Sequence, residues 1–247
     1  PVMISIPYVP TQEELGDPES IVVWYIDSND QIIVVPNGNY NPDAKAVTCI
    51  TTHLSIFAVA YDDVVFEDVP KDSWYEKAVK YIAARGITKG TGEGLFSPLS
   101  KLTRAQFITM IMRACNIQPD ADPKENFSDA GDTWYTGYLA AAKRLGISQG
   151  VGNNLFAPGK DITRQEMFTL LYNALKITKQ LPEIQEGKPI RTLSDFTDEG
   201  QIDLWAKEAM TFLVESGIIK GSDGKLIPKG SSIRAEMAQV LYNLLAK

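Results

Sequence analysis

Residues 96–107 read FSPLSKLTRAQF, in which a phenylalanine and a proline precede a short polar turn and an apolar helical pattern. The arrangement recurs as FAPGKDITRQEM at residues 156–167 and as LIPKGSSIRAEM at residues 226–237. Each copy sets an arginine where its helix begins, although the amides there carry partial positive charge and a cation is mildly unfavourable. An anion bound beside the arginine would explain why this placement occurs three times.

The three stretches belong to a longer internal repeat. The tryptophan-to-arginine spacing is 30 residues in the first two copies and 29 in the third. Each copy reads as a helix ended by a glycine, a glycine-rich turn, a proline and a second helix with a broad apolar face. Because one helix pair cannot cover such a face, we expect the three copies to pack on one another around a pseudo-threefold axis.

Residues 1–61 follow a different pattern, and we expect a small all-β module there. Its runs of Val, Ile, Thr and aromatic residues are SIVVWYI, QIIVVP, AVTCITT and SIFAVAY. The opening resembles the middle of a strand pattern, so we expect this module to be the C-terminal part of a larger upstream region. The expected domains are the β module at 1–61 and the repeats at 62–120, 121–180 and 181–247.

Composition excludes several classes of function. The net charge is −7 over 247 residues, and residues 1–61 hold seven acids and one base. Neither residues 1–61 nor the rest of the chain therefore has the excess of basic residues that nucleic-acid binding needs. No apolar run approaches the roughly 20 residues that span a bilayer. With one histidine and two cysteines, a zinc site is not expected, nor is any other cofactor. Cys49 and Cys115 are expected to be free, buried thiols.

The order Phe-x-Asp, Trp, Gly-Ile, Gly, Phe-x-Pro and Thr-Arg-x-Glu/Gln across residues 66–247 resembles the S-layer homology (SLH) domain in all three copies. The resemblance implies a mainly α fold, a trefoil of repeats around a central three-helix bundle, in a protein secreted to the bacterial cell wall or S-layer. It implies non-covalent anchoring without enzymatic activity, through secondary cell wall polysaccharide bound in grooves between repeats. That glycan commonly carries a pyruvate ketal; neighbouring surface-layer proteins are the other expected partners.

The expected ligand site combines these residues. An arginine beside helix amides would offer a carboxylate a bidentate donor, so Arg→Ala should weaken glycan binding without loss of stability. The Thr-x-x-Glu/Gln spacing also predicts capping boxes. The tryptophans can pack in the core or present a face to a sugar ring, and the aspartates can cap turns or bind hydroxyl groups. The expected contacts are Asp68, Trp74, Lys89, Gly90, Arg104 and Gln106 in the first copy, Asp129, Trp134, Gly150, Arg164 and Glu166 in the second, and Asp195, Trp205, Lys220, Gly221, Arg234 and Glu236 in the third.

The third copy departs most from the pattern. Ile233 replaces the threonine, Leu226 replaces the phenylalanine, and the loop between Asp195 and Trp205 is longer. We therefore expect the third copy to hold the most degenerate site.

Residues 49–61, CITTHLSIFAVAY, are similar to the end of GAIN-type autoproteolytic modules. That resemblance implies attack of Ser55 Oγ on the Leu54 carbonyl with His53 as general base. A strand end that is not cleaved fits the same residues, and we expect the chain to remain uncut. The alternatives to anchoring are thus a self-processing module and a structural surface-lattice protein.

Overall fold

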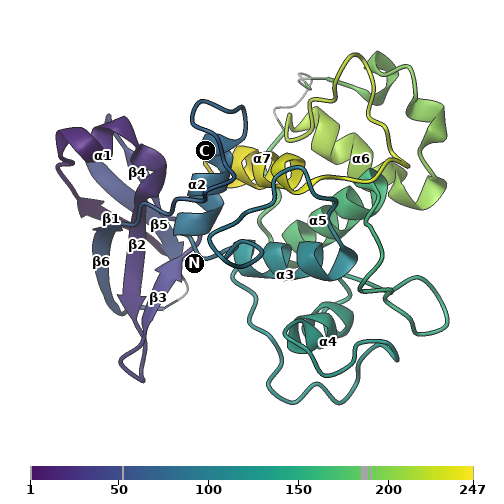
Figure 1. Ribbon diagram of the computed structural model, residues 1–247, viewed down its shortest axis with the longest axis horizontal. Helices are drawn as coiled ribbons and strands as arrows, with labels where there is room; N and C mark the ends of the chain where they lie inside the picture. The colour runs from purple at the N-terminus through teal and green to yellow at the C-terminus, as the bar shows by residue number, and fades with distance from the viewer. Residues whose placement is uncertain (1, 52, 185–188, 190, 247) are drawn as a thin grey trace. The chain divides into compact units, whose positions relative to one another are not determined.

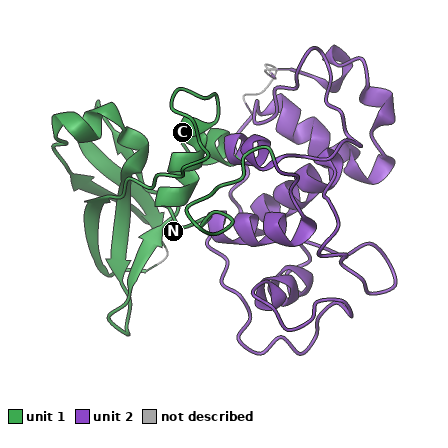
Figure 2. Cartoon of the chain, viewed as in Figure 1, with its two compact units in different colours: residues 1–99, 241–247 green, residues 100–240 purple. Residues whose placement is uncertain are grey.

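The computed structural model describes residues 2–51, 53–184, 189 and 191–246. The chain divides into two compact units, one of residues 1–99 with 241–247 and the other of residues 100–240 (Figure 2). This division does not follow the expected boundary after residue 61, because the first helix of the first repeat belongs to the same unit as the β-rich region.

The described residues of the β-rich region form six strands in two antiparallel three-stranded sheets (Figure 1). One sheet has the order β1-β5-β4 and the other β3-β2-β6. Buried aliphatic side chains and the Cys49 thiol form the core of this region. The strands are β1 (Val2–Pro7), β2 (Ile21–Ile26), β3 (Ile32–Val35), β4 (Asn39–Asn41), β5 (Ala46–Thr51) and β6 (Ile56–Tyr61).

The four predicted strand runs correspond to β2, β3, β5 and β6, where β-branched residues dominate. The opening residues, which resemble a strand pattern, form β1, whereas two further elements were missed: β4 and the short helix α1 (Gln12–Gly16). The 3-10 helix η1 (Pro18–Ser20) precedes β2. The strand β4 reads NYN and lacks the branched residues that mark a strand in sequence, so its pairing with β5 defines it.

In the part of the repeats that the structure describes there are six α-helices. The first and second copies each contribute a short helix and a longer second helix, and the third copy adds two 3-10 turns, η2 (Leu193–Asp195) and η3 (Glu199–Gln201). Within residues 100–240, α3 packs against α4 and α5, and α5 packs against α6. The helices are α2 (Glu76–Ala84), α3 (Arg104–Ala114), α4 (Thr136–Arg144), α5 (Arg164–Thr178), α6 (Leu204–Glu215) and α7 (Arg234–Leu245).

The expected fold class, a mainly α trefoil around a central three-helix bundle, is wrong. The chain is mixed α/β, with 34% helix and 18% strand, and its described residues form seven α-helices and two three-stranded sheets. The repeat pattern drew attention to the helices. The β module of residues 1–61 was expected, but its six strands and the turns of the repeats make the described part of the chain mixed α/β.

The segments that precede the three second helices hydrogen bond to one another in a closed cycle. Leu102 N–H donates to Ser232 O (2.9 Å), Ser232 N–H to Ile162 O (3.2 Å), and Ile162 N–H to Leu102 O (2.9 Å). All three residues are buried. This cycle, which lies within residues 100–240, fixes the register of the arginines at the starts of α3, α5 and α7.

Candidate functional site

Arg104, at the start of α3, is buried and bonded to groups of its own chain. It is 3% exposed, its Nε donates to Phe156 O (2.7 Å), and its Nη1 lies 2.9 Å from Glu166 Oε1. The guanidinium also lies over the Phe156 ring, with its Cζ 4.6 Å from the centroid. Burial lowers the pKa of Arg104, and the nearby Glu166 carboxylate opposes that shift. The side chain links the first repeat to the second.

Arg164 repeats this arrangement between the second and third copies. Its Nε donates to Leu226 O (2.8 Å), and its Nη1 lies 3.2 Å from Glu236 Oε1. Arg234, at the equivalent place in the third copy, is 2% exposed. Arg104 and Arg164, which sequence assigned to ligand, are therefore oriented toward protein groups.

The amides of the first helical turn are occupied as well. In α3, Arg104 N–H donates to Lys160 O (2.9 Å) and Ala105 N–H to Pro158 O (3.0 Å). In α5, the equivalent amides of Arg164 and Gln165 donate to Gly230 O and Pro228 O. Each of these two helix N-termini is closed by carbonyls of the following repeat, so a carboxylate would have to displace them.

The predicted capping boxes are confirmed. Thr103 Oγ1 accepts from Gln106 N–H, and Gln106 Oε1 accepts from Thr103 N–H. Thr163 and Glu166 make the same reciprocal pair in α5. In α7, Glu236 Oε2 accepts from Ile233 N–H (3.1 Å), so the carboxylate half of the box persists where threonine is absent.

An aspartate in each repeat clamps the loop before the second helix. Asp68 accepts from the Phe96 and Ser97 amides, and Asp129 from Phe156 and Ala157. The clamped residues Ser97 and Ala157 have φ of 58°, a left-handed conformation that costs energy unless the surroundings hold it.

In the third repeat this clamp is Asp198, which sequence reasoning missed. Asp198 is 7% exposed and accepts from Leu226 N–H (2.9 Å) and Ile227 N–H (2.7 Å). Asp195, the residue expected there, is exposed and accepts from Thr192 N–H (2.8 Å) instead. The Phe-x-Asp spacing at residues 196–198 would have identified the correct aspartate.

The glycines of the turns have a steric reason to be glycine. Gly90, Gly150 and Gly221 all have positive φ, and a Cβ at any of them would collide with the phenylalanine of its own Phe-x-Asp motif. At Gly150, the colliding groups are Leu155 O and the Phe127 ring. The glycine therefore brings the turn against the phenylalanine.

The tryptophans project into solvent. Trp74, Trp134 and Trp205 are 59%, 60% and 54% exposed, although each stands next to or at the start of a helix. Trp74 and Trp134 make edge-on contacts with the following tyrosine, at 5.2 and 5.0 Å between centroids. The three indoles therefore lie outside the core.

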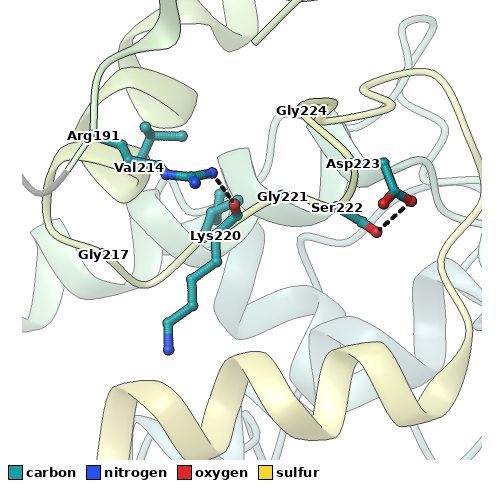
Figure 3. Close-up of a pocket in the computed structure, with 9 residues that line it drawn as sticks. Arg191, Val214, Gly217, Lys220, Gly221, Ser222, Asp223 and Gly224 are labelled. Atoms are coloured by element: carbon teal, nitrogen blue, oxygen red, sulfur yellow. Dashed lines mark hydrogen bonds between the residues drawn. The ribbon is translucent and has the colours of Figure 1, made fainter. Parts of the chain in front are cut away.

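A cavity of about 380 Å³ lies at the glycine turn of the third repeat (Figure 3). Its lining includes two basic residues, Arg191 and Lys220, and one acidic residue, Asp223. Arg191 Nη1 donates to Lys220 O (3.0 Å), and its Cζ lies 5.5 Å from the Phe196 centroid, whereas the Lys220 side chain points away from the Arg191 guanidinium (Figure 3). Within the described residues neither cation has an acidic partner. The full lining is Arg191, Val214, Gly217, Ile219, Lys220, Gly221, Ser222, Asp223 and Gly224.

This cavity brings together Lys220 and Gly221 of the expected site residues. It does not include Trp205, Arg234 or Glu236. Arg191 was missed, since it lies in a polar linker with no repeat position to mark it. The third copy, expected to be the most degenerate, is thus the one with this positively charged cavity.

A comparison with known families matches the S-layer homology domain at residues 65–108, 126–168 and 195–238. These three segments cover more than half of the chain. The chain belongs to the S-layer homology domain family. The predicted triplet of SLH repeats is confirmed, while the GAIN-like end of the β module has no match that supports it.

Relatives of this SLH chain include both S-layer proteins and enzymes. It is 34% identical to S-layer protein sap of Bacillus anthracis over 183 residues, 74% of this chain and 21% of that protein. It is 32% identical to an amylopullulanase of Thermoanaerobacterium thermosulfurigenes over 235 residues, 94% of this chain and 12% of that protein. It is also 32% identical to exoglucanase XynX of Acetivibrio thermocellus over 238 residues, 95% of this chain and 20% of that protein.

The matches cover different shares of this chain and of its relatives. The chain spans 12–21% of the length of these relatives, so an SLH segment of this kind occurs within much longer proteins. The matches to the two enzymes cover 94% and 95% of the chain and must include most of residues 1–61. Sequence similar to most of residues 1–61 therefore accompanies the SLH repeats in those proteins.

The family and its relatives place the SLH chain at the bacterial cell surface, in a secreted cell wall or S-layer protein, with cell wall anchoring as its general role. Within the described part of the chain, no helix has the length and apolar character needed to cross a membrane. The described residues also contain no cluster of three or more His, Cys, Asp or Glu side chains that could hold a metal ion.

The groups expected for self-processing are not assembled. Ser55 Oγ donates to Ile26 O, whereas His53 Nδ1 lies 3.2 Å from Thr51 Oγ1. Among the described residues, no hydrogen bond joins His53 to Ser55. Leu54 is 85% exposed and does not have a positive φ. Cys49 and Cys115 are free and buried, as expected.

Proposed function

We propose that this chain anchors its parent protein non-covalently by binding an anionic secondary cell wall polysaccharide, with a pyruvate ketal as the charged group. The observation that carries the proposal is the third-repeat cavity, where Arg191 and Lys220 have no acidic partner among the described residues. A carboxylate on a sugar supplies the missing anion. Arg191 uses one donor on Lys220 O, and a guanidinium has five N–H groups, so donors remain for a ligand.

The lining of the cavity suits a sugar as well as a charge. Gly221 and Gly224 leave the backbone accessible, and the Ser222 hydroxyl offers a further polar contact. A charge-assisted hydrogen bond to a carboxylate is about twice as strong as a neutral one. We therefore assign the carboxylate to Arg191 and Lys220 and the sugar hydroxyls to the rest of the turn.

The three exposed indoles supply the second part of the proposal. Apolar rings that stand more than half exposed at equivalent places of all three repeats fit stacking against sugar rings. Several weak sites on one chain would raise the avidity for a repetitive polymer well above the affinity of each. The arginines of the second helices then act as positioning residues that join the repeats, and Asp68, Asp129 and Asp198 hold the loops.

A co-sedimentation experiment with purified cell wall carrying its native polysaccharide tests this assignment. Lys220→Gln combined with Arg191→Gln should lower the bound fraction, because both charges of the cavity are removed. Lys225→Gln is the matched control, since Lys225 is an exposed lysine of the same turn outside the cavity lining. Equal binding of the double variant and the control would refute the cavity as the anion site.

A further inference from the structure

A second cavity, of about 350 Å³, lies within the unit formed by residues 1–99 and 241–247. The β-rich region provides most of its wall, with contributions from α2 and from the end of α7. No repeat position marks it, and it shares no residue with the third-repeat cavity. Its lining is Pro18, Glu19, Asn39, Tyr40, Asn41, Pro42, Asp43, Thr48, Tyr81, Arg85, Tyr242 and Ala246.

One wall is fixed by a buried arginine. Arg85 is 3% exposed, and its guanidinium donates to the carbonyls of Glu19 (2.7 Å), Gly38 (2.7 Å) and Ile21 (3.2 Å). Its Cζ lies 3.5 Å from the centroid of the Tyr81 ring. A buried cation held by carbonyls and a ring is costly to move, so this wall is rigid before any ligand arrives.

The other fixed groups are two phenols and an amide. Tyr81 Oη donates to Asn39 Oδ1 (2.7 Å), and Asn39 Nδ2 donates to Leu245 O (2.7 Å). Tyr242 Oη donates to Glu19 Oε1 (3.0 Å), and its ring meets that of Tyr81 edge-on at 5.2 Å. The cavity is therefore preorganised, and binding would cost little ordering of its walls.

Several lining groups remain available. Within the described residues, the Tyr40 hydroxyl, the Asp43 carboxylate and the Thr48 hydroxyl have no hydrogen-bond or ion-pair partner. The second carboxylate oxygen of Glu19 also has no partner among the described residues. These groups include both donors and acceptors, and Tyr40, Tyr81 and Tyr242 line the same cavity.

The charges of the lining select the class of ligand. Glu19 and Asp43 disfavour an anion, whereas Arg85 disfavours a cation. The polar wall disfavours a purely apolar molecule, because its unpaired groups would lose water without replacement. An uncharged molecule with many hydroxyl groups and one apolar face satisfies all these conditions. We propose that this cavity binds an uncharged sugar, separately from the anionic site of the third repeat.

The size of the cavity agrees with that class. Small-molecule sites in proteins start at about 300 Å³, and this cavity has room for a monosaccharide or a disaccharide. A sugar here would stack against Tyr40 and donate hydroxyl hydrogens to Glu19 and Asp43. The β module would then contribute a neutral-glycan contact of its own to attachment.

An NMR titration of the full chain tests the proposal, with cellobiose and N,N'-diacetylchitobiose as uncharged probes and galacturonic acid as the anionic probe. At millimolar concentrations, an uncharged probe should shift the amides of residues 39–41, Asp43, Thr48 and Arg85, and galacturonic acid should not. Asp43→Ala and Tyr40→Ala should each weaken binding about tenfold. Asp43 is exposed and its carboxylate has no described partner, so Asp43→Ala should leave the melting temperature unchanged.

Two controls separate this site from others. Glu13→Ala removes an exposed acid of the same unit outside the cavity and should leave binding unchanged. Lys220→Gln alters the third-repeat cavity and should also have no effect here, whichever way the anchoring test ends. Absence of shifts with both uncharged probes, equal shifts with galacturonic acid, or unchanged affinity in Asp43→Ala and Tyr40→Ala would each overturn the proposal.

Discussion

Arg104 and Glu166 form an ion pair of 2.9 Å in which the arginine side chain is 4% exposed and the glutamate side chain 20%. The same glutamate accepts from Thr163 N–H (2.8 Å) and thereby caps α5. The Glu166 carboxylate thus contacts the N-terminus of α3 in the first repeat and the N-terminus of α5 in the second. The positive charge of Arg104 is unfavourable beside the N-terminus of its own helix, and the negative charge of Glu166 in the second repeat compensates it.

This relationship predicts that Arg104→Ala lowers stability, contrary to the expectation from sequence. The substitution leaves Phe156 O and a partly buried Glu166 without their donor, which should cost about 2–4 kcal/mol of unfolding free energy. Chemical denaturation of the whole chain measures it. Lys101→Ala is the control, because Lys101 pairs with Asp161 on the surface with its side chain 64% exposed and should cost under about 1 kcal/mol. Equal losses would contradict the structural role.

The clamp of the third repeat predicts unequal effects for two neighbouring aspartates. Asp198→Ala removes the acceptor of the Leu226 and Ile227 amides, of which the first is buried, and should cost about 2 kcal/mol or more. Asp195→Ala removes an exposed contact and should cost under about 1 kcal/mol. Thermal melting of the two variants side by side gives the comparison. A larger loss in Asp195→Ala would restore the assignment made from sequence.

The glycine turns predict a steric effect in the second repeat. Gly150→Ala places a Cβ against Leu155 O and the Phe127 ring at a φ of 76°, so the turn must move or the protein must lose stability. Gly159→Ala, where a Cβ meets nothing within 4 Å, is the matched control. Circular dichroism melts should show a lower midpoint for Gly150→Ala alone. A stable Gly150→Ala protein would show that the turn tolerates a side chain.

The exposed indoles predict a loss of binding without a loss of stability. Trp134 is 60% exposed, so Trp134→Ala should change the unfolding free energy by less than about 1 kcal/mol. It should lower the affinity for cell wall polysaccharide, because an indole face that stacks on a sugar is removed. Binding isotherms and melts on the same preparation check both statements. Early melting with unchanged affinity would make Trp134 a packing residue.

The local features of the repeats could be predicted from the sequence because each depends on a short motif. Thr163 and Glu166 predict a capping box from their spacing alone, and the structure contains it. The hydrogen-bond partners of Arg104 could not be predicted from the sequence, because Phe156 and Glu166 are more than 50 residues away in the sequence. A motif shows that an arginine starts a helix; only the fold shows what lies opposite.

The prediction of the fold class was wrong for a related reason. The helical repeats have strong, regular signals, whereas β4 depends on its pairing with β5 and carries no pattern of its own. Only part of the lining of the third-repeat cavity could be predicted from the sequence. Lys220 and Gly221 stand at repeat positions, but Arg191 lies in a linker. Side chains from linkers are placed by tertiary contacts, which a repeat alignment does not contain.

Isothermal titration of the whole chain with purified cell wall polysaccharide, before and after removal of its pyruvate ketals, tests the proposed anchoring most directly. The two samples differ in the carboxylate assigned to Arg191 and Lys220, so the account predicts that removal lowers the affinity by about tenfold or more. Equal affinity for the two samples would contradict it.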